Sequence, residues 1–221
     1  MGANTCTYDR ARVRPMVPVR TRAGGAVITQ RLFIGVPCAG PAPELDAYLG
    51  ALAAPQWRMV PRAQRHWTLA FLGPQPDEVV APLITALDSG LERQAAFRLD
   101  LAGLGAFPSG RRPTSLWVGC TSGQDRLEPL SQAVRDAVRA AGLAVDPRPL
   151  RPHVTVARRR AHAEPAVAAR GGEAWIQGGE GRSWGRVEVS QVVLWRSDLE
   201  PTGARYTPLR IWPLAGRPEV P

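Results

Sequence analysis

Hydrophobic and polar positions follow strand-like and helix-like patterns from about residue 30 onward. Short apolar runs bounded by glycine or proline are typical of strands, whereas apolar residues four apart indicate amphipathic helices. The pattern predicts strands over 31–36, 66–72, 97–104, 115–120, 153–157, 187–189, 192–195 and 209–212. It predicts helices over 44–53, 79–91 and 127–138, the last ending at Gly142. Because strands and helices mix without strict alternation, the expected fold class is α+β.

The first 29 residues lack this patterning. Arginines are spread among prolines and glycines there, with no apolar period. We expect residues 1–29 to form a basic, disordered tail and residues 30–215 to form one folded domain. An arm that holds RNA is the alternative interpretation of the tail.

Two segments of the predicted domain share one pattern of residues. His66-Trp67-Thr68-Leu69-Ala70 and His153-Val154-Thr155-Val156-Ala157 both read histidine, apolar, threonine, apolar, alanine. Each follows an apolar strand that ends in glycine and then a helix. This repetition indicates an internal duplication. It predicts two pseudo-symmetric lobes, each of which contributes one motif strand to a central cleft.

The strand period places the polar residues of each motif together. Because successive strand residues face opposite sides, His66 and Thr68 should share one face, as should His153 and Thr155. The alanine that ends each motif should lie on that face too, whereas the apolar spacers and Phe71 should face a core. If the lobes pack about a pseudo-twofold axis, the two polar faces meet and surround one small anion.

Two imidazoles and two hydroxyls around one anion suit the cleavage of a cyclic phosphodiester. A neutral imidazole can accept a proton from attacking water, and a protonated one can donate a proton to the leaving ribose oxygen. The hydroxyls of Thr68 and Thr155 can donate hydrogen bonds to non-bridging phosphate oxygens. With nearby arginines supplying positive charge, this chemistry needs no metal and no other cofactor. A metal hydrolase is disfavoured because neither motif has a third histidine or a carboxylate at ligand spacing.

Charge and composition add little to this picture. The formal net charge is +9, but all 28 basic residues are arginine, as is typical of a GC-rich genome. The charge therefore supports an RNA partner without establishing one. Cys6, Cys38 and Cys120 form no close pair, which argues against disulfides and thiolate zinc sites and fits a reducing cytoplasm. The sequence shows no signal peptide and no apolar stretch of membrane-spanning length, so we expect a cytoplasmic protein and a monomer.

The paired motifs resemble those of the 2H phosphoesterase superfamily. The surrounding sequence resembles one branch, the RNA 2′,3′-cyclic phosphodiesterases, also called 2′-5′ RNA ligases, over residues 31–212. The segments that carry the resemblance are 31–37, 68–73, 103–108, 151–153 and 157–158. The resemblance implies a bilobal fold with two antiparallel sheets lining a cleft, and hydrolysis of 2′,3′-cyclic RNA ends to 2′-phosphomonoesters. It also implies that His66 is the proton donor and His153 the proton acceptor.

Three further residues are candidates near the motifs. The resemblance assigns a phosphate-binding role to Arg158, whereas strict alternation from His153 puts Arg159 on the cleft face instead. Phe107 could stack on a nucleobase, although a core position is the commoner one for phenylalanine. His162 lies in a loop-like stretch, and we expect it to be an ordinary surface residue.

The motif set leaves related activities open. An RNA 2′-5′ ligase or a nucleotide cyclic phosphodiesterase would use the same motifs, because joining is the reverse of the same chemistry. An RNA-end-binding module with incidental turnover is a different class of protein. In all of these the expected partners are RNA ends or nucleotides that carry a 2′,3′-cyclic phosphate.

Overall fold

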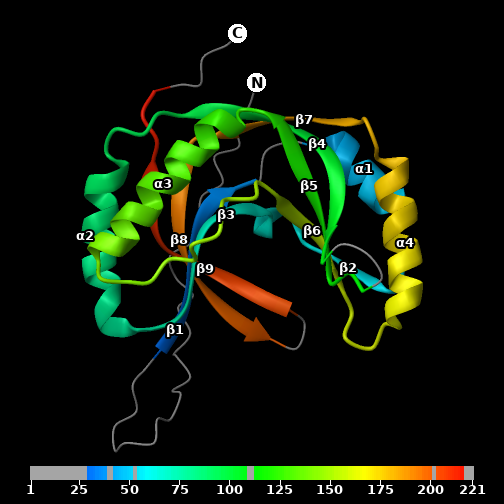
Figure 1. The fold of residues 1–221 in the computed structure, drawn as a ribbon, viewed down its shortest axis with the longest axis horizontal. Helices are drawn as coiled ribbons and strands as arrows, with labels where there is room; N and C mark the ends of the chain where they lie inside the picture. The colour runs from blue at the N-terminus through cyan, green and yellow to red at the C-terminus, as the bar shows by residue number, and fades with distance from the viewer. Residues whose placement is uncertain (1–28, 39–41, 52–53, 109–111, 201–202, 217–221) are drawn as a thin grey trace, which may run out of the picture.

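The computed structural model describes residues 29–38, 42–51, 54–108, 112–200 and 203–216, and Figure 1 shows their arrangement. The strands are β1 Thr29–Pro37, β2 Trp57–Met59, β3 His66–Pro76, β4 Phe97–Phe107, β5 Ser115–Ser122, β6 Val154–Arg159, β7 Ser183–Val189, β8 Gln191–Glu200 and β9 Gly203–Pro213. The helices are α1 Pro43–Ala51, α2 Val80–Leu91, α3 Gln124–Ala140 and α4 Pro165–Gly178, with short 3₁₀ turns at Arg62–Gln64 and Asp77–Val79. The α+β class is confirmed. Residues 1–28 of the predicted tail (1–29) lie outside the described residues, and its last residue, Thr29, instead begins β1, where it pairs with Pro76 of β3.

Helix α4 and strand β2 are absent from the hydrophobic pattern. Strand β2 has only three residues, too few for a period. Helix α4 buries small residues instead of a leucine stripe: its buried side is Ala168, Gly172 and Trp175. Its start does carry a signal, because the carboxylate of Glu164 accepts hydrogen bonds from two backbone N–H groups of the first turn and proline follows at the first helical position.

All the strands belong to one antiparallel sheet. Its order is β7-β4-β5-β6-β3-β1-β8-β9, with β2 paired to β6. The two halves of this order meet at β3 and β6, which pair only at Trp67 and Val154. The two predicted sheets are therefore joined into one curled sheet by a single pair of motif residues.

The arrangement of helices repeats in the two halves. The succession β1-α1-β3-α2 corresponds to β5-α3-β6-α4. Helices α2 and α3 lie together over one half of the sheet, and α1 and α4 lie over the other (Figure 1). The helix after each opening strand thus crosses to the opposite half, α1 packing against β7 and α3 against β3. This crossing ties the halves together and fits the duplication that the sequence predicts.

Both motif strands contain a β-bulge at the same place. Along β3 the register with β1 skips Leu69, and along β6 the register with β5 skips Val156. An extra residue reverses the alternation beyond it. The alanines after the bulges are therefore buried, whereas Phe71 is 48% exposed and Arg158 is exposed. The predicted faces of Ala70, Ala157 and Phe71 were wrong for this reason.

Gly35 allows β1 to approach the first motif strand closely. A Cβ at this position would lie less than 3.0 Å from the carbonyl oxygen of Trp67. We expect Gly35→Ala to lower the free energy of unfolding by about 1–3 kcal/mol, the usual cost of overpacking, because backbone must move. Thermal and urea unfolding measure the effect.

Gly50 provides the matched control for this substitution. It lies in α1, and a Cβ there would meet no atom within 4 Å. Gly50→Ala should leave stability unchanged or raise it by up to about 1 kcal/mol, because alanine favours helix. Equal effects of the two substitutions would contradict the close approach of β1 to β3.

Candidate active site

His66 begins β3 with a fixed ring orientation. Its Nδ1 lies 2.7 Å from the carbonyl oxygen of Gln64, two residues back. A carbonyl only accepts, so Nδ1 carries the hydrogen and the neutral ring keeps its lone pair on Nε2. The backbone turn before β3 thus selects the tautomer of His66.

His153 repeats this arrangement directly before β6. Its Nδ1 lies 2.7 Å from the carbonyl oxygen of Arg151, again two residues back. The same tautomer follows, with Nε2 as the nitrogen left for chemistry. The duplication therefore extends from the sequence motif to the hydrogen bonds of both imidazoles.

The junction of the two motif strands brings the four predicted polar side chains together. Trp67 pairs antiparallel with Val154. This register places His66 beside Thr155 and Thr68 beside His153 on the face opposite the buried Trp67 and Val154. Each imidazole therefore lies next to the threonine of the other half.

Two connected hollows open on this face. One, of about 410 Å³, is lined by His66, Thr155 and Arg158 among others. The second, of about 380 Å³, is lined by His66, Thr68 and Arg158 among others. Because they share His66 and Arg158, they are two arms of one cleft. His153 is not among the described residues that line either arm.

Arg158, not Arg159, belongs to the cleft. The bulge at Val156 turns Arg158 to the side of Thr155, and its positive charge lowers the pKa of both histidines. Arg159 faces away, and its guanidinium donates to the carbonyl oxygens of Pro113 and Ala163. Strict alternation failed here because it assumed a regular strand.

Aromatic rings surround His66. Phe33 from β1 lies 4.8 Å from the imidazole, centroid to centroid, Tyr206 from β9 lies 5.2 Å away edge-on, and Trp195 from β8 lies 5.5 Å away. These rings exclude water from the sides of the imidazole and fix its plane. Strands from both ends of the chain therefore build the pocket of one histidine.

Phe107 and Trp117 form the corresponding wall beside His153. Phe107 meets the imidazole edge-on at 4.9 Å and stacks on Trp117 at 5.2 Å. Phe107 is half-buried. The structure thus places it neither in the core nor free in the cleft, but against the second motif histidine.

Burial and charge favour the neutral form of both imidazoles. Burial, together with the charges of Arg158 and His153 and against the opposing effect of the Gln64 carbonyl, lowers the pKa of His66 to about 4. Burial, followed by the charge of Arg158, also lowers the pKa of His153. An anion bound between them would oppose the arginine and raise both values.

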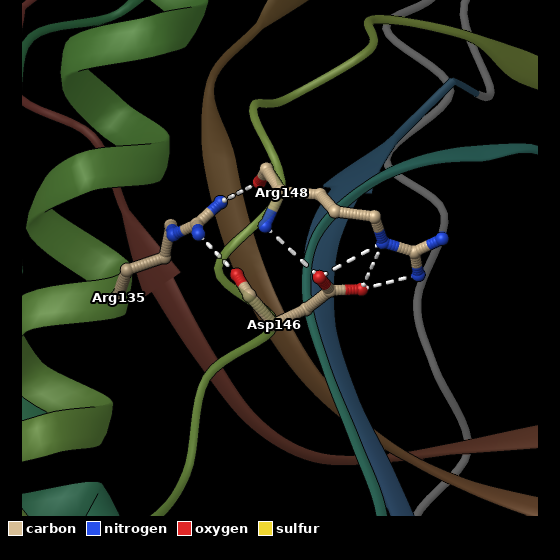
Figure 2. A network of polar contacts seen from close by, with 3 residues as sticks. All are labelled: Arg135, Asp146 and Arg148. Atoms are coloured by element: carbon tan, nitrogen blue, oxygen red, sulfur yellow. Dashed lines mark hydrogen bonds and ion pairs between the residues drawn. The ribbon is translucent and has the colours of Figure 1, made fainter.

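The segments that precede the two histidines are tied to the crossing helices. In the first half, Arg65 is buried and its guanidinium lies 2.5 Å from the carboxylate of Asp46 on α1. In the second half, Arg135 of α3 donates to the backbone carbonyls of Asp146 and Arg148, as Figure 2 shows. The approach to each imidazole is therefore fixed by an arginine and a helix.

Asp146 and Arg148 complete the second of these anchors. The guanidinium of Arg148 binds the Asp146 carboxylate and holds the pKa of that carboxyl at about 2, and the Arg148 backbone N–H donates to it as well (Figure 2). The loop that leads to His153 is thus stabilised by contacts within itself as well as by its contacts with α3.

The remaining sequence candidates lie apart from the cleft. His162 is exposed, as expected of a surface residue. Cys38 and Cys120 are buried free thiols, and burial raises the pKa of Cys38 to about 12, while Cys6 lies outside the described residues. Within the described ranges, no three histidine, cysteine or acidic side chains gather as metal ligands would. None of the described helices is both long and apolar enough to cross a bilayer.

Several cleft residues escaped the sequence analysis. Arg58 comes from β2, and Tyr206 comes from the β8–β9 hairpin. Gly203 makes room for Arg58, because a Cβ there would collide with the guanidinium. No local pattern marks such residues, since their place in the cleft depends on the fold of distant segments.

Fold and site together define a class of protein: an α+β chain in which two repeated His-x-Thr strands meet at the centre of one sheet. Residues 41–200 match the 2′-5′ RNA ligase superfamily. The chain belongs to this family.

Relatives and solved structures agree with this assignment. An RNA 2′,3′-cyclic phosphodiesterase of Geobacillus stearothermophilus is 34% identical over 158 residues, 70% of this chain and 46% of that protein. One of Thermus thermophilus is 34% identical over 170 residues, 72% of this chain and 77% of that protein. The crystal structure of E. coli LigT complexed with 3′-AMP superposes with a TM-score of 0.64 at 27% identity, covering 85% of this chain and 99% of LigT. The chain thus spans about half of the Geobacillus relative and most of the others.

Proposed function

We propose that this protein hydrolyses 2′,3′-cyclic phosphate ends of RNA to 2′-phosphomonoesters, without a metal ion, using His66 and His153 as an acid–base pair. The observation that carries the proposal is the repeated site itself. Two imidazoles with the same Nδ1 anchor lie on adjacent strands, each beside a threonine and both within the field of Arg158.

The reaction uses each group once. The base, assigned to His153, accepts a proton from water through Nε2 as the water oxygen bonds to phosphorus. The bond between phosphorus and the ribose 3′ oxygen breaks, and the acid, assigned to His66, donates a proton to that oxygen. The product keeps the phosphate on the 2′ oxygen. One proton leaves His66 and one reaches His153, so the pair must be restored before the next cycle.

The remaining groups hold the phosphate. Thr68 and Thr155 can donate hydrogen bonds to its non-bridging oxygens, and Arg158 supplies positive charge where negative charge builds up. In this role the guanidinium replaces a metal ion as the source of positive field. Burial and, after it, the charge of Arg158 lower the pKa of His153, which favours the deprotonated base in the free enzyme.

The direction of proton transfer rests on the family resemblance. In the free site the more strongly lowered pKa belongs to His66, the assigned acid. We infer that His66 gains its proton together with the anionic substrate, whose charge offsets that of Arg158. Without bound substrate, a proton on His66 would exchange with solvent and would reach no leaving oxygen.

The similar proteins support the substrate class. Both curated relatives carry the name RNA 2′,3′-cyclic phosphodiesterase, and LigT was crystallised with 3′-AMP. A ribonucleotide phosphate is therefore a suitable ligand for a cleft of this kind, and the ribose of an RNA end supplies the leaving oxygen that the acid requires.

A short RNA with a 2′,3′-cyclic phosphate end provides the test. We expect catalytic conversion to the 2′-phosphate, at a rate that excess EDTA leaves unchanged. Phosphorus NMR or chromatography against 2′- and 3′-phosphate standards identifies the product. Loss of turnover in EDTA that zinc or manganese restores would refute metal independence, and binding of the RNA without turnover would indicate an end-binding module. Adding an RNA with a free 5′-hydroxyl tests for ligation.

A further inference from the structure

The cleft extends beyond His66 along β3. Its second arm reaches from His66 and Thr68 to Phe71 and Arg31. Phe71 is 48% exposed, which is unusual for so large an apolar side chain. The guanidinium carbon of Arg31 lies 4.7 Å from the centre of its ring, at cation–π distance. An exposed ring therefore holds a cation in place at the edge of the cleft.

The duplication relates the pair of Phe71 and Arg31 to Arg158 in the other half. Phe71 occupies the position in the first motif strand that Arg158 occupies in the second, because both follow the bulge and the buried alanine. The second strand thus provides a cation directly. The first provides a ring that carries the cation of Arg31 from the neighbouring strand β1. The proposed function uses Arg158 and leaves Arg31 without a role.

Among the described residues, Arg31 lacks an acidic partner. Over the part of the chain that the structure describes, no acidic side chain forms an ion pair with Arg31. Glu200 also lines this arm, but its carboxylate lies 3.3 Å from the guanidinium of Arg205. With Arg58 and Arg158 nearby, the arm is positive and suits an anion.

A second phosphate of the substrate is the anion within reach. Phe71 follows Thr68 by three strand residues, at most about 10 Å, which is comparable with the reach of one nucleotide. A cyclic mononucleotide has only its reacting phosphate, whereas an RNA end also has the phosphodiester that links its last two nucleotides. The geometry points to Arg31, steadied by Phe71, as the binding group for this linking phosphate. This inference rests on the proposed function and makes the site selective for RNA ends over cyclic mononucleotides.

Matched substrates test the inference. Uridine 2′,3′-cyclic phosphate, the dinucleotide UpU with the same cyclic end, and that dinucleotide with a neutral methylphosphonate linkage differ only in the upstream part. We expect kcat/KM for the normal dinucleotide to exceed that of the mononucleotide by about tenfold to a hundredfold, the worth of a hydrogen bond between charged groups. The neutral linkage should remove most of this advantage.

Variants assign the advantage to Arg31. Arg31→Gln should reduce the advantage of the charged dinucleotide to within about threefold while leaving mononucleotide turnover near wild type, because the reacting phosphate is bound elsewhere. Phe71→Leu should reduce it partly, by freeing the guanidinium. Arg139→Gln is the control, because Arg139 pairs with Asp136 on the exposed side of α3 and should leave both substrates unaffected.

The possible outcomes separate this inference from the proposed function. An equal loss on both substrates in Arg31→Gln, or a dinucleotide advantage that survives it, would overturn the role of Arg31. Failure of the wild type to hydrolyse either substrate would count against the proposed function instead. In that case, binding measurements with uridine 2′-phosphate and with UpU ending in a 2′-phosphate still test the role of Arg31. Arg31→Gln should weaken binding of the dinucleotide and leave binding of the mononucleotide unchanged.

Discussion

Replacing either motif histidine with alanine is expected to lower kcat by roughly a hundredfold to ten-thousandfold, the usual worth of a positioned acid or base. In the proposed mechanism, His66→Ala removes the group that protonates the leaving oxygen, and His153→Ala removes the group that accepts the proton of water. Single-turnover hydrolysis of a short cyclic-phosphate RNA measures the loss without interference from product release. The double variant should be only slightly worse than either single one, because groups that act as a unit are not additive.

His162→Ala is the matched control for these substitutions. This exposed histidine should leave turnover unchanged. Thermal unfolding of all the variants separates chemistry from folding, since the motif histidines are only half-buried and their loss should cost little stability. A folded His66→Ala protein that kept near-normal turnover would show that the acid–base assignment is wrong.

The threonines should matter less than the histidines. Thr68→Ala and Thr155→Ala each remove one hydrogen-bond donor near the phosphate, a loss on the order of tenfold to a few hundredfold in kcat. Because each threonine lies beside the imidazole of the other half, the pair of values also tests whether both halves contribute equally to one site.

The sequence predicted which residues meet at the centre of the candidate site because the duplication repeats there residue by residue. A histidine and a threonine two apart on a strand must share a face, so both motif pairs were identified without a structure. The same period failed two residues later. A bulge cannot be deduced from the motif itself, and it decided both that Arg158 faces the cleft and that Phe71 leaves the core.

The walls of the cleft were beyond prediction for a different reason. Tyr206 and Arg58 line the cleft from segments that lie far along the chain or are too short to have a period. Helix α4 lacks an apolar stripe because it packs through small residues: a Cβ at Gly172 would press on Leu116 and Trp57 at 3.2–3.3 Å. The hydrophobic pattern identifies elements that bury large apolar side chains. It misses elements whose backbones pack closely through small residues.

The pH dependence of kcat/KM is expected to be bell-shaped, with its maximum below about pH 6.5, the ordinary pKa of histidine. In the proposed mechanism the productive complex holds one proton on the pair, taken up as the substrate binds, so kcat/KM follows the ionisation of the free site. At high pH both imidazoles are neutral and no acid remains, and at low pH both are charged and no base remains. Because burial and Arg158 lower the pKa of both histidines, both limbs shift towards acid. Above the apparent pKa of the alkaline limb, kcat/KM should fall about tenfold for one pH unit and about a hundredfold for two.

Saturating substrate should move this profile. The bound phosphate carries negative charge, which favours protonated imidazole and raises both pKa values. The maximum of kcat should therefore lie at higher pH than that of kcat/KM. The limbs of both profiles belong to the coupled pair and not to either histidine alone.

Substituting Arg158 isolates the cause of the shift. Arg158→Gln removes a positive charge that lowers both pKa values, so the maximum of kcat/KM should move to higher pH even as its height falls. Arg159→Gln provides the neighbouring control, because its guanidinium binds the carbonyls of Pro113 and Ala163 and should leave the position of the maximum unchanged. A kcat/KM maximum above pH 7, unmoved by Arg158→Gln, would show that the two imidazoles do not titrate in the field of this arginine. The height of the profile reports phosphate binding and its position reports charge, so the two roles of Arg158 can be measured in one experiment.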